Sequence, residues 1–215
     1  VAFDEKGPTF RHTAYEGYKA TRKPMPDELA SQMPILKDIL SAMHIPTYSL
    51  SGWEADDILG TAGRICGEHG WDCVIVTGDR DSLQLVDDHV TVKLITTKGG
   101  QTRSVNYTPA VFQEEYGFSP KGLIDLKALM GDSSDNYPGV PGVGEKTAKD
   151  LMHKSGTLDN VYAHAEDEAL KPALRRKLQE GRDSAYQSYE LATIRCNAPM
   201  NFSPEANLIT AWDRP

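Results

Sequence analysis

The segment DCVIVTGDRDSLQLV, residues 72–86, decides how this chain is expected to fold. Its first part, DCVIVT, is a continuous β-branched run, which is typical of a strand buried on both faces of a parallel sheet. Asp79 and Asp81 follow this run and can project to one side while the chain stays extended. Because ligands of α/β sheets bind beyond the carboxyl ends of the strands, the segment predicts an α/β fold with an acidic site at that edge.

More strands and two helices are predicted around this segment. The strands are expected at residues 1–3, 48–50, 90–96 and 101–107, and the helices at residues 25–43 and 53–70. The apolar residues of both helices recur at a helical period, and Pro34 is expected to kink the first helix. The last two strands flank Gly99-Gly100 and are therefore predicted to form a hairpin.

The second half of the chain has a helical pattern. Thr108-Pro109 and Ser119-Pro120 each provide an N-cap residue followed by proline at the first helical position. The fold class is therefore α/β, with a PIN-like or Rossmann-like sheet flanked by helices and followed by a helical subdomain. We expect the α/β core over residues 1–107, with a basic segment at residues 8–26, and the helical subdomain over residues 108–215.

The composition of the 215 residues is that of an ordinary globular domain. Hydrophobic residues make up 39% and charged residues 25%, both close to the averages of soluble proteins. No apolar run approaches the roughly 20 residues that cross a bilayer. The three cysteines form no CxxC pair, which argues against a disulfide framework and a structural zinc site. We therefore expect a soluble, cytoplasmic monomer with no membrane segment.

Acidic residues gather at the ends of four predicted elements. They are Asp4 after the first strand, Glu54, Asp56 and Asp57 at the start of the second helix, Asp79 and Asp81 after the β-branched run, and Asp132 and Asp135 after an apolar helix. Helix capping explains Glu54 and Asp57 well, because acids near a helix N-terminus interact favourably with the macrodipole. It explains Asp132 badly, because the C-terminus of a helix is the unfavourable end.

A metal site accounts for all four clusters. Like charges gathered in one place repel one another unless cations hold them. An all-oxygen ligand set suits Mg²⁺ or Mn²⁺, and two such ions about 4 Å apart activate a water and stabilise the leaving oxygen of a phosphodiester. Without these eight acids, the 31 acids of the chain fall to 23 and equal the 23 Lys and Arg, so the net charge of −8 reflects the site.

The basic segment at residues 8–26 has the composition of a DNA-binding element. Its basic and aromatic residues at or beside helical spacing are Arg11, Tyr15, Tyr18, Lys19 and Arg22. Such a face can contact phosphates and stack the bases of a single strand. The alternative is a solvated helix face with partly buried tyrosines.

A glycine-rich turn at residues 139–144 lies between two predicted helices, at residues 123–130 and from about residue 145. Gly142 and Gly144 permit close backbone approach, and a helix N-terminus offers free N–H groups to a phosphate. Lys146 and Lys149 add positive charge beside the turn. A simple loop between helices is the alternative.

At these residues the sequence strongly resembles the 5′ nuclease (5′-3′ exonuclease) domain of bacterial DNA polymerase I, in the flap endonuclease family. The matching motifs, in family order, are VAFDEKGPTFRH, YKATR, GWEADDIL, VTGDRDSLQLV and LMGDSSDNYPGVPGVGEKTA. The resemblance covers the chain from Val1 to about Met200. It implies that the glycine-rich turn is part of a helix–hairpin–helix at about residues 123–153 and that the basic segment forms an arch around the 5′ strand.

The resemblance also implies roles for individual residues. The metal ligands are then Asp4, Glu54, Asp56, Asp57, Asp79, Asp81, Asp132 and Asp135. The catalytic residues are Asp4, Asp56, Asp79, Asp81, Arg11 and Lys19, and the DNA contacts are Arg11, Tyr15, Tyr18, Lys19, Arg22, Gly142, Gly144, Lys146 and Lys149. The backbone of Val140 and Val143 is expected to bind K⁺.

One departure from the family pattern concerns the start of the sequence. Family members begin with a further central strand that carries an Asp in an LLIDGN-like motif, and this sequence starts after it. We therefore expect a gap in the sheet and one missing carboxylate.

The leading hypothesis is a structure-specific 5′ nuclease that cuts 5′-flap or branched DNA with two Mg²⁺ or Mn²⁺ ions, in replication and repair. A polymerase domain that follows in a longer parent chain is a candidate partner. A DNA-binding fragment with reduced or no nuclease activity is the second hypothesis, and a PIN-like ribonuclease is the third.

Overall fold

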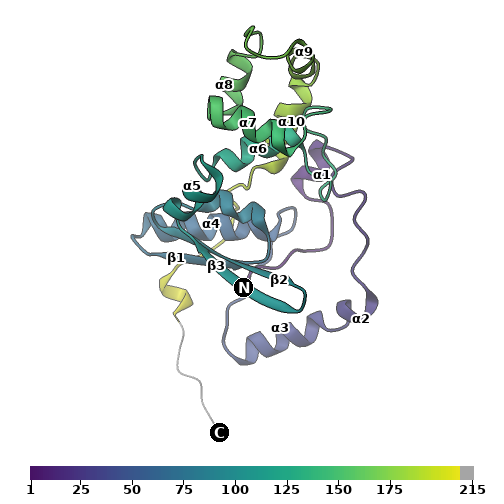
Figure 1. Ribbon diagram of the computed structural model, residues 1–215. Helices are drawn as coiled ribbons and strands as arrows, with labels where there is room; N and C mark the ends of the chain where they lie inside the picture. The colour runs from purple at the N-terminus through teal and green to yellow at the C-terminus, as the bar shows by residue number, and fades with distance from the viewer. Residues whose placement is uncertain (209–215) are drawn as a thin grey trace.

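The computed structural model describes residues 1–208, which form an α/β part and a helical part (Figure 1). The α/β part contains α1 (Phe10–Ala14), α2 (Asp27–Ala30), α3 (Met33–Ala42), α4 (Ala55–Glu68), β1 (Cys73–Thr77), η1 (Arg80–Leu85), β2 (Val90–Lys98) and β3 (Gln101–Tyr107). The helical part contains α5 (Pro109–Tyr116), α6 (Gly122–Met130), α7 (Glu145–Ser155), α8 (Leu158–Ala163), α9 (Pro172–Glu180) and α10 (Arg182–Ala192), followed by η2 (Glu205–Asn207).

The sheet has the order β1-β2-β3. Strand β1 pairs in parallel with β2, and β2 pairs antiparallel with β3. Gly99 and Gly100 join β2 to β3 with φ values of 58° and 75°, the left-handed conformation that tight hairpin turns need, so the predicted hairpin is confirmed. The strands predicted at residues 1–3 and 48–50 are reduced to a single parallel bridge between Ala2 and Tyr48.

The prediction that β1 is buried on both faces is wrong. Ile75 is 3% exposed, whereas Val74 and Val76 are 58% and 61% exposed. Helix α4 packs against β1 and covers the face that carries Ile75. Within residues 1–208 nothing buries the side chains on the opposite face, which leaves an apolar surface on the sheet.

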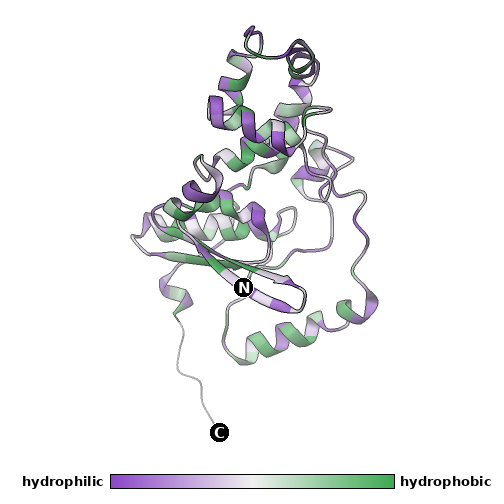
Figure 2. Cartoon of the chain, in the orientation of Figure 1, coloured by the Kyte–Doolittle hydropathy of each residue, from purple (hydrophilic) through white to green (hydrophobic). Residues whose placement is uncertain are grey.

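The single kinked helix predicted over residues 25–43 is two helices. Pro34 lies in the first turn of α3, where backbone N–H groups have no partner within the helix. Its lack of an N–H therefore costs no hydrogen bond, and Pro34 begins a helix instead of kinking one. Figures 1 and 2 show α3 standing apart from the sheet with an apolar stripe. No residue of α3 is buried, and Ile35, Leu36 and Ile39 are among its exposed side chains.

The main core runs without interruption from the sheet into the helical part. It includes Leu83 and Val92 of the α/β part and Leu129, Met152 and Leu178 of the helical part. Helix α6 packs against both α7 and α10 and also contacts η1, which places it beside the segment that follows β1.

The two predicted helix starts had different outcomes. Thr108 caps α5 as predicted, because its Oγ accepts a hydrogen bond from the Val111 N–H at 3.4 Å. The cap predicted at Ser119 is wrong, because residues 119–121 form a turn closed by the Gly122 N–H and the Ser119 carbonyl, and α6 begins only at Gly122.

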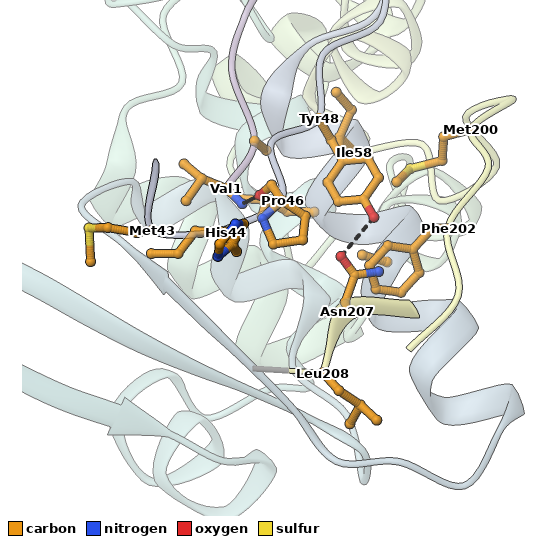
Figure 3. Close-up of a pocket in the computed structure, with 14 residues that line it drawn as sticks. Val1, Met43, His44, Pro46, Tyr48, Ile58, Met200, Phe202, Asn207 and Leu208 are labelled. Carbon is orange, nitrogen blue, oxygen red and sulfur yellow. Dashed lines mark hydrogen bonds between the residues drawn. The ribbon is translucent and has the colours of Figure 1, made fainter. Parts of the chain in front are cut away.

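An apolar pocket of about 350 Å³ lies where residues 1–2, 43–48 and 200–208 meet α4 (Figure 3). The Tyr48 hydroxyl donates to Asn207 Oδ1 at 2.8 Å across it. No carboxylate of the part of the chain that the structure describes lines this pocket, so it is separate from the acids described below. Among residues 1–208, no helix has the length and apolar character that crossing a membrane requires.

Candidate active site

Six carboxylates line one small cavity of about 90 Å³. They are Asp4, Glu54, Asp56, Asp79, Asp81 and Asp135, and the same cavity is lined by Arg11, Tyr18, Lys19, Arg22 and Tyr137. All four acid clusters of the sequence therefore contribute to this cavity. Two predicted metal ligands, Asp57 and Asp132, are not among the lining residues.

The acids after β1 are placed by a tight turn. We expected the chain to stay extended there, but Asp79 caps the 3₁₀ helix η1, and its Oδ1 accepts from the Asp81 N–H at 2.9 Å. On the other side of the site, Asp4 Oδ1 accepts from the Ala55 N–H at 2.7 Å. Asp4 therefore interacts with the N-terminus of α4, the favourable end of the helix dipole.

Arg11 and Asp57 pair with each other in the structure, so the DNA contact expected of Arg11 and the metal binding expected of Asp57 stay predictions. Arg11 is 2% exposed and Asp57 is fully buried. The guanidinium donates to both Asp57 oxygens at 2.8 Å and to Glu54 Oε2 at 3.2 Å. Asp57 also accepts from the Glu54 and Arg195 N–H groups, so no free position remains on its carboxylate for a cation.

The Tyr18 hydroxyl joins two of the lining acids. It lies within hydrogen-bond distance of Glu54 Oε2 at 3.0 Å and Asp135 Oδ2 at 3.1 Å. Lys19 Nζ donates to Glu54 Oε1 at 2.7 Å, and Arg22 pairs with Asp135. Tyr18 is 3% exposed, and its expected contact with DNA stays a prediction.

The helical spacing of the basic segment does not produce one helix. Helix α1 ends at Ala14, and the backbone is extended at Tyr15. Lys19 has a φ of 54°, in the left-handed region that is uncommon for a side chain of its size, and its N–H donates to the Asp135 carbonyl. Contacts with the site, rather than local periodicity, therefore determine the path of residues 15–22.

Lys127 is a site residue that the sequence analysis missed. Its ammonium pairs with Asp81 and with Asp132, and its side chain is 14% exposed. Burial alone would raise the pKa of Asp132, but hydrogen bonds from Lys127 and Ser134 lower this pKa to about 2. The signal was a lysine on the mostly apolar α6, close to Asp132.

The carboxylates repel one another where no cation lies between them. Burial and, after it, the charge of the neighbouring Asp79 together raise the pKa of Asp56 to about 6. The Ser82 hydroxyl donates to Asp56 Oδ1 at 3.1 Å and opposes this shift in part. Ionised Asp56 is therefore less stable in the folded protein than in the unfolded chain.

Asp56→Asn should therefore stabilise the metal-free protein by about 3 kcal/mol at neutral pH. Because the folded pKa of about 6 exceeds the ordinary 3.8, the unmodified protein should gain stability as the pH falls through about 6. Urea denaturation in EDTA at about pH 7.5 and about pH 5 measures both effects. A variant with unchanged stability and the same pH dependence would contradict this account.

The acid cavity fits a divalent cation by its chemistry. All its carboxylate and hydroxyl donors are hard oxygens, which Mg²⁺ and Mn²⁺ prefer. In residues 1–208 no three Asp, Glu, His or Cys side chains are already arranged to chelate one ion. Several of the acids are instead bonded to Lys19, Arg22 and Lys127.

The glycine-rich turn is held on one side by α9 and α10. Ser188 Oγ accepts from the Gly139 N–H at 3.0 Å, and Ser184 Oγ donates to the Gly139 carbonyl at 2.6 Å. Lys177 Nζ donates to the Gly142 carbonyl at 2.8 Å. A Cβ at Gly139 would lie 2.2 Å from the Gly131 nitrogen, so this close backbone contact requires glycine.

The opposite side of the turn is open. Gly144 is the N-cap of α7, and a Cβ there would meet no atom within 4 Å. Lys146 is exposed on the first turn of α7, and Lys149 pairs with Glu145 at 2.7 Å. The helix–hairpin–helix predicted at about residues 123–153 thus has its two helices, α6 and α7, and the N-cap residue of the second is exposed.

An acid-lined cavity beside a strand end, joined to a helical part with an open glycine turn, defines a nuclease domain. Family models match both parts: "5'-3' exonuclease, N-terminal resolvase-like domain" at residues 1–117 and "5'-3' exonuclease, C-terminal SAM fold" at residues 118–215. The chain belongs to the 5′-3′ exonuclease family.

Sequence relatives are DNA polymerases. The chain is 46% identical over 203 residues to DNA polymerase I of Bacillus caldotenax, covering 94% of this chain and 23% of that protein. It is 43% identical over 214 residues to DNA polymerase I of Caldicellulosiruptor bescii, covering 100% of this chain and 25% of that protein. The chain therefore spans about a quarter of the length of these relatives.

Solved structures of two other proteins have a similar fold. The bacteriophage T5 D15 protein, co-crystallised with metal ions, gives a TM-score of 0.73 at 22% identity, covering 91% of this chain and 73% of that one. The catalytic core of Rad2 in complex with DNA substrate gives a TM-score of 0.58 at 18% identity, covering 98% of this chain and 69% of that one. At these identities the likeness concerns the fold.

Proposed function

We propose that this chain is a divalent-metal-dependent 5′ nuclease that hydrolyses a phosphodiester near the junction of a 5′ flap or a 5′ end in DNA. The observation that carries the proposal is the convergence of six carboxylates on one cavity beside β1. Membership of the 5′-3′ exonuclease family supports it. So do the fold likenesses, one of which is the bacteriophage T5 flap endonuclease in a complex with DNA and metal ions.

The cavity acids are the proposed cation ligands. Asp4, Asp56, Asp79 and Asp81 stand on the α/β part, and Asp135 approaches from the loop after α6. When bound, a pair of divalent cations supplies a polarised water and stabilises the leaving oxygen. Asp132 lies outside the cavity on Lys127 and is a proposed ligand only if that lysine moves away.

The DNA is proposed to lie along the open side of the glycine turn. Gly144 and the first N–H groups of α7 are proposed to face a phosphate, and Lys146 and Lys149 add positive charge. The DNA contact of Gly142, whose carbonyl accepts from Lys177, stays a prediction. Lys19 and Arg22 line the acid cavity and are the proposed phosphate contacts nearest the reacting bond. Binding of K⁺ by the backbone of Val140 and Val143 stays a prediction.

The longer relatives support a place for this domain in a polymerase-type protein. In such a protein the polymerase part would create a 5′ flap as it displaces a strand, and the nuclease part would remove the flap. The partner class is therefore proposed to be a DNA-synthesising domain.

A cleavage assay tests the proposed function. The chain is incubated with an end-labelled 5′-flap DNA in Mn²⁺ or Mg²⁺, in EDTA, and with single-stranded RNA as an alternative substrate. We expect metal-dependent cleavage near the flap junction and little cleavage of RNA. Cleavage that persists in EDTA would reject the metal mechanism, and preferential cleavage of RNA would favour the PIN-like ribonuclease. Salt-sensitive binding of flap DNA without any product would favour the DNA-binding fragment.

A further inference from the structure

Two buried tyrosine hydroxyls have no hydrogen-bond partner among the residues that the structure describes. They belong to Tyr137 and Tyr162. An unmade hydrogen bond of a buried hydroxyl costs about 1–3 kcal/mol, so such groups are rare and usually mark a bound water, ion or ligand. The surroundings of the two hydroxyls distinguish them.

Tyr162 lies away from the acids. It stands on α8 of the helical part, where its ring stacks on Tyr186 with 5.5 Å between the centroids. Arg182 lies over the same ring. Tyr162 is half-buried and is not a lining residue of the acid cavity, so its hydroxyl points to no ligand.

Tyr137 lines the acid cavity and is 3% exposed. Its backbone is fixed by a pair of hydrogen bonds with Asp132, in which the Tyr137 N–H donates at 3.1 Å and the Asp132 N–H donates at 2.9 Å. Its ring packs in a small apolar cluster with Tyr18, Ile124 and Leu191. The side chain is therefore held in place by backbone pairing and by packing.

The phenol group of Tyr137 lies among the acids without bonding to them. Burial raises the pKa of this phenol, and so do the charges of Asp81, Asp132 and Asp135, which means that it stays protonated. Asp81 and Asp132 instead pair with Lys127, and Asp135 pairs with Arg22 and Tyr18. The Tyr137 hydroxyl is left as an unused donor and acceptor beside the cavity.

We propose that Tyr137 is a positioning residue whose hydroxyl hydrogen-bonds an oxygen ligand of a divalent cation in the acid cavity. The inference rests on the proposed function, because it requires that the cavity acids bind a cation. The cavity of about 90 Å³ is far larger than the ~10–15 Å³ that one water needs. Groups that orient the ligands of a metal in this way change metal affinity by about 10–100-fold.

Tyr137→Phe tests the proposal because it removes only the oxygen atom. Mn²⁺ binding is measured by calorimetry on the DNA-free chain, and thermal stability is measured in EDTA. We expect Mn²⁺ affinity to fall by about 10-fold or more. Stability in EDTA should not fall, because within residues 1–208 the hydroxyl has no partner to lose. Tyr162→Phe is the matched control, since it removes the other unpartnered hydroxyl, and it should bind Mn²⁺ like the unmodified chain.

A second measurement, of the affinity for flap DNA, identifies the oxygen atom that the Tyr137 hydroxyl contacts. A loss of affinity for Mn²⁺ alone supports a water ligand. Unchanged Mn²⁺ affinity with an approximately 10-fold loss of affinity for flap DNA in Ca²⁺ supports a phosphate oxygen. If Tyr137→Phe matches the unmodified chain in both arms, the inference is overturned while the proposed function stands. If the unmodified chain itself binds no Mn²⁺, the proposed metal site fails and this inference fails with it.

Discussion

Replacing Asp79 by asparagine should lower the rate of 5′-flap cleavage about 10³-fold, equivalent to about 4 kcal/mol of transition-state stabilisation. Asp79 is one of the six acids that line the cavity, and it is exposed at the end of β1, where a cation and a phosphate can reach it. Asparagine keeps the shape of the side chain but removes the negative charge that binds a cation. The fold should survive, because asparagine caps a helix as well as aspartate does and Asp79 caps η1.

Single-turnover cleavage of a labelled flap substrate in saturating Mn²⁺ measures the effect of Asp79→Asn, and a thermal denaturation curve verifies the fold. Asp72→Asn is the matched control, because it makes the same substitution at the other end of the same strand, where the side chain is 93% exposed. We expect the control to cleave at the normal rate. Normal cleavage by Asp79→Asn would show that Asp79 is not required for the reaction.

The edge of the sheet at which the acids gather was predictable from a short stretch of sequence. A β-branched run followed by Asp79 and Asp81 identifies a strand and its end, and both properties are local. Local pattern also identified the hairpin at Gly99-Gly100 and the cap at Thr108. Which faces of β1 are covered depends on its neighbours, so the exposure of Val74 and Val76 was not predictable from the run itself.

The partners of the charged residues are the part that sequence pattern did not supply. Arg11 and Asp57 lie 46 positions apart, and Tyr18 and Asp135 lie 117 apart. Helical spacing in the basic segment suggested one exposed face, but α1 ends at Ala14, and Arg11 and Tyr18 turn inward to the acids. Periodicity describes a helix in isolation, whereas a buried carboxylate determines which nearby cation becomes its partner.

The roles of Lys127 and Tyr137 in the site also could not be predicted from sequence pattern. Each lies within five positions of Asp132, so the sequence placed them near a proposed ligand. Neither residue type is a usual ligand of a hard cation, and a lysine on a helix is ordinarily a solvated side chain. Only the fold, which brings Asp81 beside α6, gives Lys127 two acidic partners and leaves the Tyr137 hydroxyl without one among residues 1–208.

Replacing Arg11 by methionine should destabilise the protein by about 3–5 kcal/mol, a large part of the roughly 5–15 kcal/mol that stabilises a typical domain. Arg11 donates to Asp57 and Glu54 and also to the carbonyls of Leu191 and Thr193, at 2.9 and 2.6 Å. It thereby joins α1, α4 and the end of α10. Methionine fills much of the same volume but leaves the fully buried Asp57 with an uncompensated negative charge.

Urea denaturation of Arg11→Met, alone and combined with Asp57→Asn, separates loss of the pair from loss of packing. We expect the second substitution to restore part of the stability, because it removes the unpaired buried charge. Arg22→Met is the control: Arg22 also pairs with a site acid, but its side chain is 49% exposed, so its loss should cost less than about 1 kcal/mol. Equal stability losses in Arg11→Met and Arg22→Met would show that burial does not determine how much the Arg11–Asp57 pair contributes to the free energy of unfolding. A role of Arg11 in DNA contact would then be favoured.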